Sequence, residues 1–316
     1  MAGTQVTTPF GVPIDRPESR LPFYVDVLRR LVREKPLGLI GGVLVVMYFI
    51  AAIAAPLIAP YGPNELGAGP RLGGPTLDNF MGTDNLGRDI FSRVIYGARV
   101  SMTIGFVAVL IATLISLVVG ALSGYFGGLF DILAQRLIDA FIAFPGLVFI
   151  IAVGAIFTDT QISGLPKSGV FQTQNVILAI TIGVLLGVGS SRIIRGAALS
   201  VKSTAYVEAT RATGATHTRI ILFHVLPNVM APTITLATLG LGTAILSESA
   251  LSFLGLGVSP DTATWGGMLN REARTFMSQN AWIAIFPGLA LSMAIFGFNM
   301  LGDALRDLLD PRLRTG

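Results

Sequence analysis

Residues 200–232 read SVKSTAYVEATRATGATHTRIILFHVLPNVMAP, a polar and basic stretch between two long apolar runs. We predict a short helix over residues 205–213, on which positions three and four apart are neighbours. One face of this helix is small apart from a single acid, and it consists of Ala205, Glu208, Ala209 and Ala212. Small side chains let another surface approach the backbone closely, and Gly214 permits the left-handed conformation with which helices commonly end.

A second helix is predicted after this glycine. The hydroxyl of Thr216 can cap its first turn by accepting a backbone hydrogen bond. Pro227 is expected to end it, because proline removes a backbone donor and clashes with the preceding turn. The stretch is therefore predicted to form a helix–turn–helix. This unit is either a solvated connection between two membrane spans or a surface that binds another protein.

The composition of the whole chain indicates a membrane protein. Of its 316 residues, 52% are hydrophobic and 13% are charged, and the mean hydropathy is +0.71. Soluble domains carry about 25% charged residues. The chain is therefore predicted to be an all-α, polytopic membrane protein.

Charge and residue usage exclude several functions. The net charge of +4 and the pI of 9.7 come from basic residues scattered at span ends and in loops, so we expect no nucleic-acid partner. The chain has no cysteine and two histidines, His217 and His224, both in the central stretch. Disulfides and cysteine nucleophiles are excluded, and a histidine-rich metal site is implausible. We expect no catalytic residue, metal or cofactor in this chain.

Six apolar runs are long enough to cross a hydrocarbon core of about 30 Å. They cover residues 37–59, 100–122, 131–157, 176–192, 233–253 and 281–301. The chain divides into a tail with an interfacial amphipathic helix (1–36), the first span (37–59), an outer loop with a second interfacial helix (60–99), the remaining core (100–302) and a second tail (303–316). Phe23 and Val27 belong to the apolar side of the first interfacial helix. The second starts near Asp84, with Ile90 and Val94 on its apolar side.

Charged side chains inside the predicted spans are candidate functional residues. Arg136 and Asp139 are three apart and can pair on one helical face, which costs less in lipid than either charge alone. Pro145, later in the same run, should kink the helix. Glu248 lies between two serines in the fifth span. It is either a functional acid or a hydrogen-bonding group that meets a neighbouring helix or a partner subunit.

The basic residues also predict the orientation in the membrane. Six spans place both termini on one side, together with residues 200–232. The segments on that side carry about twice as many lysines and arginines as those on the other side. Because basic residues are retained in the cytosol, both termini and the central stretch are expected to be cytosolic.

The central stretch also resembles a known family. Its residues are spaced as in the EAA loop of permease subunits from ATP-driven importers with a separate binding protein, at Glu208, Ala209, Gly214, Leu226 and Pro227. The sequence departs from the family pattern at Thr210, where the family has alanine, and at His224, where it has isoleucine. In that family the loop is a coupling helix that docks in a groove of the ATP-hydrolysing subunit. The resemblance implies the same role here.

Other runs resemble the dipeptide, oligopeptide and nickel branch of these importers. They are GTDNLGRDIFSRVIYGARVS (82–101), the series Asp131, Arg136, Asp139, Phe144 and Pro145, SFLGLGV (252–258), WGGML (265–269) and GDALRDLLDPR (302–312). The resemblance implies a type I ABC importer permease of the C-type, in the lipid of a prokaryotic inner membrane, forming half of the pathway for peptides or similar small solutes. The implied partners are a second permease in a heterodimer, two ATP-binding subunits that hold the ATP, and an extracytoplasmic solute-binding protein.

Other functions stay open on the sequence alone. An importer of the same family could carry nickel or another non-peptide solute. An ion-gradient-driven carrier usually shows repeated halves and midplane ionisable groups, for which Glu248 is the strong acidic candidate here. A membrane-embedded hydrolase would need a serine–histidine pair, a cysteine nucleophile or a zinc site. No cysteine or histidine falls within a predicted span, so these groups are missing.

Overall fold

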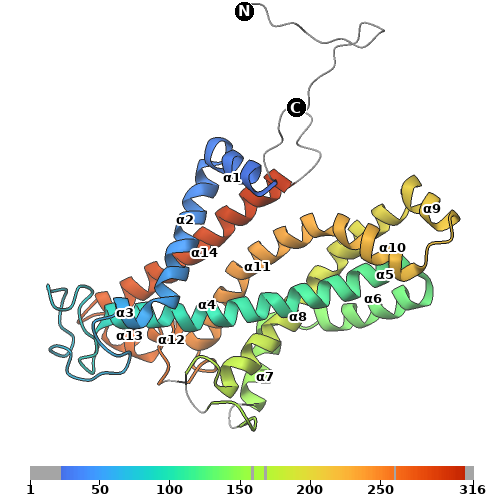
Figure 1. Ribbon diagram of the computed structural model, residues 1–316. Coiled ribbons are helices and arrows are strands. Elements are labelled where there is room, and N and C mark those ends of the chain that lie inside the picture. Colours follow the sequence, from blue (N-terminus) through green and yellow to red (C-terminus); the bar gives the residue numbers. More distant parts are fainter. Residues whose placement is uncertain (1–22, 158–159, 167–168, 260, 310–316) are drawn as a thin grey trace, which may run out of the picture.

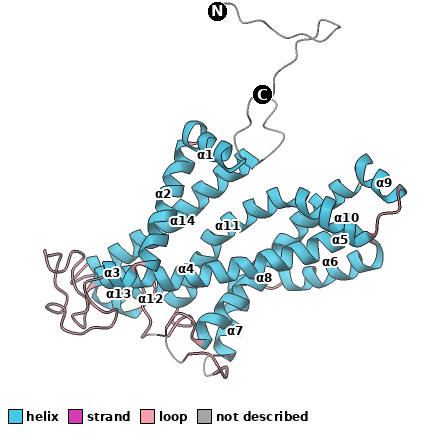
Figure 2. Cartoon of the chain, in the orientation of Figure 1, coloured by secondary structure: helices cyan, strands magenta, loops and turns pink. Residues whose placement is uncertain are grey.

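The computed structural model describes residues 23–157, 160–166, 169–259 and 261–309. Within these ranges the regular elements are helices (Figure 2), apart from an isolated bridge between Thr83 and Asp89. The predicted all-α fold is confirmed. The outer parts of the two predicted tails, residues 1–22 and 310–316, lie outside the described residues.

Within the described ranges, five helices are long and apolar enough to cross a membrane. They are α2 (Pro36–Ile53), α4 (Ile90–Ile115), α8 (Thr173–Lys202), α11 (Leu226–Phe253) and α14 (Trp282–Leu309). Short helices lie at their ends: α1 (Phe23–Glu34), α3 (Ala55–Ile58), α9 (Ala205–Ala212), α12 (Trp265–Met268) and α13 (Arg271–Phe276). From the end with α3, α12 and α13, which we call the α12 end, the helices fan out in two groups (Figure 1). α2 and α14 run towards α1, whereas α4, α8 and α11 run towards the α9 end.

A bent pair supplies a sixth span if its two helices are counted together. α6 (Gly128–Ile142) and α7 (Gly146–Ile156) meet at an angle of 79°. Pro145, with φ −57° and ψ 120°, is extended at this break, since proline has no N–H with which to continue the helix. The count of six spans agrees with the prediction, and the predicted kink at Pro145 is a complete break.

The prediction of a second interfacial helix within residues 60–99 is wrong, because the apolar side of that segment packs inside the protein. The helix of this segment, α4, is the start of a long span. α4 continues directly into a π-helical turn, η1 (Ser116–Gly120), and then into a further helix, α5 (Ala121–Phe126). Asp89 caps the span by accepting a hydrogen bond of 2.7 Å from a first-turn backbone N–H. Ile90 and Val94 are buried, and the Trp265 indole donates to the Val94 carbonyl at 3.0 Å.

Pro227 does not end the second helix of the central stretch. That helix passes without interruption into α11, through α10 (His217–Ile220) and a π-helical turn, η2 (Ile221–Val225). Pro227 lies in the first turn of α11, directly after the wider π turn, where its missing N–H is tolerated. The predicted cap is confirmed, because the Thr216 side chain accepts a hydrogen bond from the Arg219 backbone N–H.

Other span ends also differ from the prediction. α2 ends at Ile53, and α3 completes the predicted first span after a break at Ala54. α8 continues past Arg192 to Lys202, and α14 continues past residue 301 to Leu309. The apolar runs on which the prediction rests end at the first charged residues. The backbone hydrogen bonds of α8 and α14 continue beyond those residues.

The main core lies where α4, α8, α11 and α14 meet. Glycines of α8 bring it close to α4: a Cβ at Gly183 would lie 2.7 Å from the Ala108 carbonyl oxygen. A Cβ at Gly187 would lie 2.8 Å from the Ala112 carbonyl oxygen. Small residues at these positions let two spans pack at backbone distance. α4 and α8 therefore pack closely at the centre of the main core.

α1 packs against the far end of α14. Leu31 is buried there, and Lys35 Nζ lies 2.5 Å from an Asp307 carboxylate oxygen. The side chains of Phe23 and Val27, assigned to the apolar face of the interfacial helix, lie outside the described residues. The helix itself is confirmed, and its interfacial location stays a prediction.

Candidate functional site

α9 presents its small face to the outside. The helix covers Ala205–Ala212, close to the predicted range, and the four residues of the predicted face are all exposed. Val207, on the opposite side, is fully buried in a second, smaller core. This core is formed by Ala121, Tyr125, Ile194, Ala198, Val207, Ile220, Val225 and Val229. Val207 therefore anchors α9 on the ends of α5, α8 and α11, and Asn228 Nδ2 of α11 donates to the Tyr206 hydroxyl at 3.0 Å, while Glu208 and Ala209 are exposed.

The turn after α9 depends on a glycine. Gly214 has φ +85°, a conformation that other residues rarely adopt, and its N–H donates to the Arg211 carbonyl at 3.0 Å. A Cβ there would meet nothing within 4 Å, so the requirement is conformational and not steric. Leu226 is half-buried and Pro227 is exposed at the start of α11. The residues that match the EAA pattern thus lie together at the α9 end.

A tyrosine that the sequence analysis did not single out joins this loop to the second long span. Tyr125, at the end of α5, is buried, and its hydroxyl lies 2.8 Å from His217 Nδ1 of α10. Lys202 Nζ and Arg211 Cζ each lie 5.9 Å from the centre of the Tyr125 ring, within the range of cation–π attraction. We call these four residues the tyrosine joint. The partners of Tyr125 are distant in sequence, which is why it is not identified in the sequence analysis.

The tyrosine joint should hold the loop in place. Tyr125→Phe keeps the ring and both cation contacts but removes the hydroxyl bonded to His217. A net hydrogen bond contributes about 1 kcal/mol, so local opening should become about fivefold more frequent. We expect trypsin to cut at Arg211 correspondingly faster in the solubilised protein. Tyr61→Phe, which removes a tyrosine hydroxyl from the loop after α3, is the control and should leave the rate unchanged; equal rates in wild type and Tyr125→Phe would show that the joint does not hold the loop.

The predicted pairing of Arg136 with Asp139 is wrong, because α8 supplies a closer cation. Asp139 pairs with Arg192 of α8, and Arg136 is exposed. A second pair joins the same two helices, in which Arg195 donates to both carboxylate oxygens of Asp131 at 2.6 and 2.5 Å. Arg192 and Arg195 are not identified in the sequence analysis, because only the packing of α8 beside α6 brings them to these carboxylates. They hold the bent span against α8.

Glu248 is a hydrogen-bonded group inside the fold. It is fully buried, and the hydroxyls of Ser252 and Ser249 donate to its two oxygens at 2.8 and 3.2 Å. Ser252 Oγ also accepts from the backbone N–H of Val258 at 3.4 Å, which ties the end of α11 to the returning loop. Of the two interpretations, this geometry favours the hydrogen-bonded one, and Glu248 lines neither of the cavities described below.

The GTDNLGRD run forms a buried ion network at the α12 end. Arg88 Nε lies 2.6 Å from Asp84 Oδ2, and Arg93 Nε lies 3.8 Å from the same oxygen. Asp89 accepts from Asn79 Nδ2 at 3.0 Å. These side chains are buried, so the run fixes the outer loop on α4 and does not anchor an interfacial helix.

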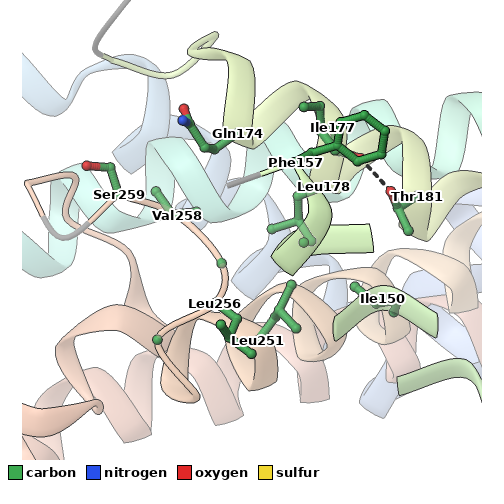
Figure 3. Close-up of a pocket in the computed structure, with 13 residues that line it drawn as sticks. Ile150, Phe157, Gln174, Ile177, Leu178, Thr181, Leu251, Leu256, Val258 and Ser259 are labelled. Atoms are coloured by element: carbon green, nitrogen blue, oxygen red, sulfur yellow. Dashed lines mark hydrogen bonds between the residues drawn. The ribbon is translucent and has the colours of Figure 1, made fainter. Parts of the chain in front are cut away.

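Two neighbouring cavities open at the α12 end. The first lies between α7, α8, α11 and the loop 254–259, and its lining is mostly apolar. Leu178 and Leu251 point toward one another across it (Figure 3), and the Thr181 hydroxyl is turned to the Ile177 carbonyl at 2.8 Å. The second cavity, which we call the charged cavity, has Arg99 and Asp261 in its wall together with Tyr96 and Asn64, and Ser259 lines both cavities. Among the described residues, no cluster of histidines and carboxylates could hold a metal ion.

Two family descriptions match this chain. Residues 116–315 match "Binding-protein-dependent transport system inner membrane component", and residues 23–75 match "N-terminal TM domain of oligopeptide transport permease C". The dipeptide transport system permease protein DppC of Alkalihalophilus pseudofirmus is 37% identical, over 92% of this chain and 90% of its own length. The glutathione transport system permease protein GsiD of Escherichia coli is 38% identical, over 96% of this chain and 95% of its own length.

A solved structure shares the fold. A chain of the methionine ABC transporter MetNI, in inward-facing conformations, superimposes with a TM-score of 0.52 at 19% identity, over 69% of this chain and 96% of that one. Fold and sequence together define a multi-pass, helical membrane permease. The chain belongs to the family of binding-protein-dependent transport system inner membrane components, and it is a permease subunit of an ABC importer.

Proposed function

We propose that this permease forms half of the translocation pathway for peptides or similar small solutes. The other half comes from a second permease, and an extracytoplasmic binding protein delivers the solute. Two separate ATP-binding subunits hydrolyse ATP, and they act on this chain through α9. The names of the relatives, which are dipeptide and glutathione permeases, support a peptide cargo. The protein lies in a prokaryotic inner membrane with both termini and the α9 end in the cytosol.

One observation carries the coupling part of this proposal. α9 has a bare face of three alanines and one glutamate, while its single buried side chain, Val207, roots it in the second core. A helix that projects from a membrane bundle with a small, uncovered face suits docking into a groove of a partner protein.

The route from α9 into the membrane follows from its contacts. Val207 packs with residues of α5, α8 and α11, and the tyrosine joint connects the loop to α5. Displacement of α9 by the ATP-binding subunits would therefore tilt these spans together and open the pathway to alternate sides. ATP can shift this equilibrium only through contacts that differ between the two states, and α9 supplies those contacts.

Energy source separates this proposal from an ion-gradient-driven carrier. In proteoliposomes that hold the complete complex, peptide uptake should require ATP and should persist when ionophores remove all ion gradients. Uptake that continues on an ion gradient without ATP would contradict the proposal and favour the carrier. A nickel importer would instead show ATP-dependent uptake of the metal and none of a dipeptide.

A further inference from the structure

The two cavities at the α12 end differ in the charge of their walls. The wall of the charged cavity contains one cation and one anion, Arg99 of α4 and Asp261 of the loop before α12, and both are exposed. Within the described residues, the wall of the apolar cavity contains no charged residue. Phe157 and Leu256 are the exposed apolar side chains of the apolar cavity. Ser259 belongs to both walls, so the two cavities adjoin each other.

Most other polar groups of the charged cavity already have partners. Asn64 Nδ2 donates to the Asp261 carbonyl at 2.5 Å, and its Oδ1 accepts from Arg93 at 3.1 Å. Gln172 Nε2 donates to the Asn175 side chain at 3.1 Å. Within the described residues no ion pair joins Arg99 to Asp261. The two charges, and not the amides, are therefore the groups that a ligand would meet.

A short peptide with free termini matches this arrangement. Its carboxylate suits the planar, two-pronged donor of an arginine, and its ammonium suits a carboxylate. An apolar side chain of the same peptide would gain from leaving water for the neighbouring apolar cavity. Exposed ion pairs are weak, which is appropriate for a site that a transported molecule must leave again.

We infer that the two cavities form a subsite for a zwitterionic peptide, with Arg99 at its carboxylate, Asp261 at its ammonium and its apolar side chain against Phe157, Leu256 and Ile177. The inference rests on the proposed function in that it takes a peptide as the cargo. It assigns a role to Arg99, the last residue of the glycine-alanine-arginine run at 97–99, which neither the buried ion network nor α9 explains.

The test is photolabelling of the assembled importer without ATP. The probe is a leucine dipeptide in which one side chain carries a diazirine. The label is expected on residues that line the apolar cavity, and excess unlabelled leucyl-leucine should suppress it. Arg99→Gln and Asp261→Asn should each reduce labelling about two- to fivefold, as expected for one exposed charge pair.

Matched variants distinguish the site from general surface charge. Arg71→Gln and Asp78→Asn remove exposed charges at the same end of the molecule that line neither cavity, and they should leave labelling unchanged. A probe with an amidated carboxyl group should label weakly and should no longer respond to Arg99→Gln.

Three outcomes would overturn the inference: label outside the cavities, labelling indifferent to Arg99 and Asp261, or no peptide label together with cross-linking of the binding protein from Arg99. The last would assign the charged cavity to a protein partner. Because labelling needs neither ATP nor transport, failure of the subsite can be distinguished from failure of the proposed function. Intact ATP-driven uptake with no label defeats the subsite alone, and label without ATP-driven uptake defeats the importer mechanism alone.

Discussion

Ala209→Trp is expected to abolish the stimulation of ATP hydrolysis by solute-loaded binding protein. Ala209 lies on the exposed face of α9, so the indole would project outward and disturb no contact within the chain. In a groove that fits a small face, the same indole would keep the helix from seating. A loss of only about 1.4 kcal/mol in docking reduces binding tenfold. We expect at least that reduction in stimulated hydrolysis by the reconstituted complex, with membrane insertion of the chain unchanged.

Ala209→Ser is the matched control for this experiment. Serine adds one oxygen and keeps the face small, so stimulated hydrolysis should remain close to that of the wild type. If the tryptophan variant is stimulated as strongly as the serine variant, the face of α9 does not enter a groove. If it fails to insert, the substitution has acted on folding, and Ala212→Trp on the same face provides the second variant.

Gly214→Pro should uncouple the transporter by a different route. The native φ of +85° is inaccessible to proline, which holds φ near −65° and also lacks the N–H that donates to Arg211. α9 would then lose its position against the second core, whereas the membrane spans would be unaffected. We expect loss of ATP-driven uptake together with loss of stimulated hydrolysis, both measured in proteoliposomes.

Asparagine at the same position separates conformation from side-chain size. Gly214→Asn adds a side chain in open space, and asparagine tolerates the left-handed conformation better than most residues. This variant should retain most of its uptake. Equal activity of the proline variant would mean that the position of α9 does not matter for coupling.

The parts of the fold that depend on local sequence were predictable. Apolar runs of sufficient length predicted the spans, Pro145 predicted the break between α6 and α7, and Gly214 and Thr216 predicted the turn around α9. Each of these effects acts within a few residues, and no distant contact opposes it.

The parts that depend on distant contacts were not predictable from the sequence. Asp139 had a cation three residues away, yet it pairs with Arg192 because α8 lies alongside α6. Ile90 and Val94 form an amphipathic side in either location, and only Trp265 distinguishes core from interface. The tyrosine joint needs Tyr125 and His217 to meet from separate elements, and no short motif carries that information.

Cross-linking from α9 is the most direct test of the account. The chain has no cysteine, so Ala209→Cys supplies a unique thiol in this subunit, to which a maleimide-benzophenone can be attached in the assembled importer. Illumination should link this permease to an ATP-binding subunit, whereas the same probe at the exposed Leu57 of α3 should not. Labelling of the Ala209→Cys thiol from outside intact cells, or its cross-linking to the binding protein, would contradict the account.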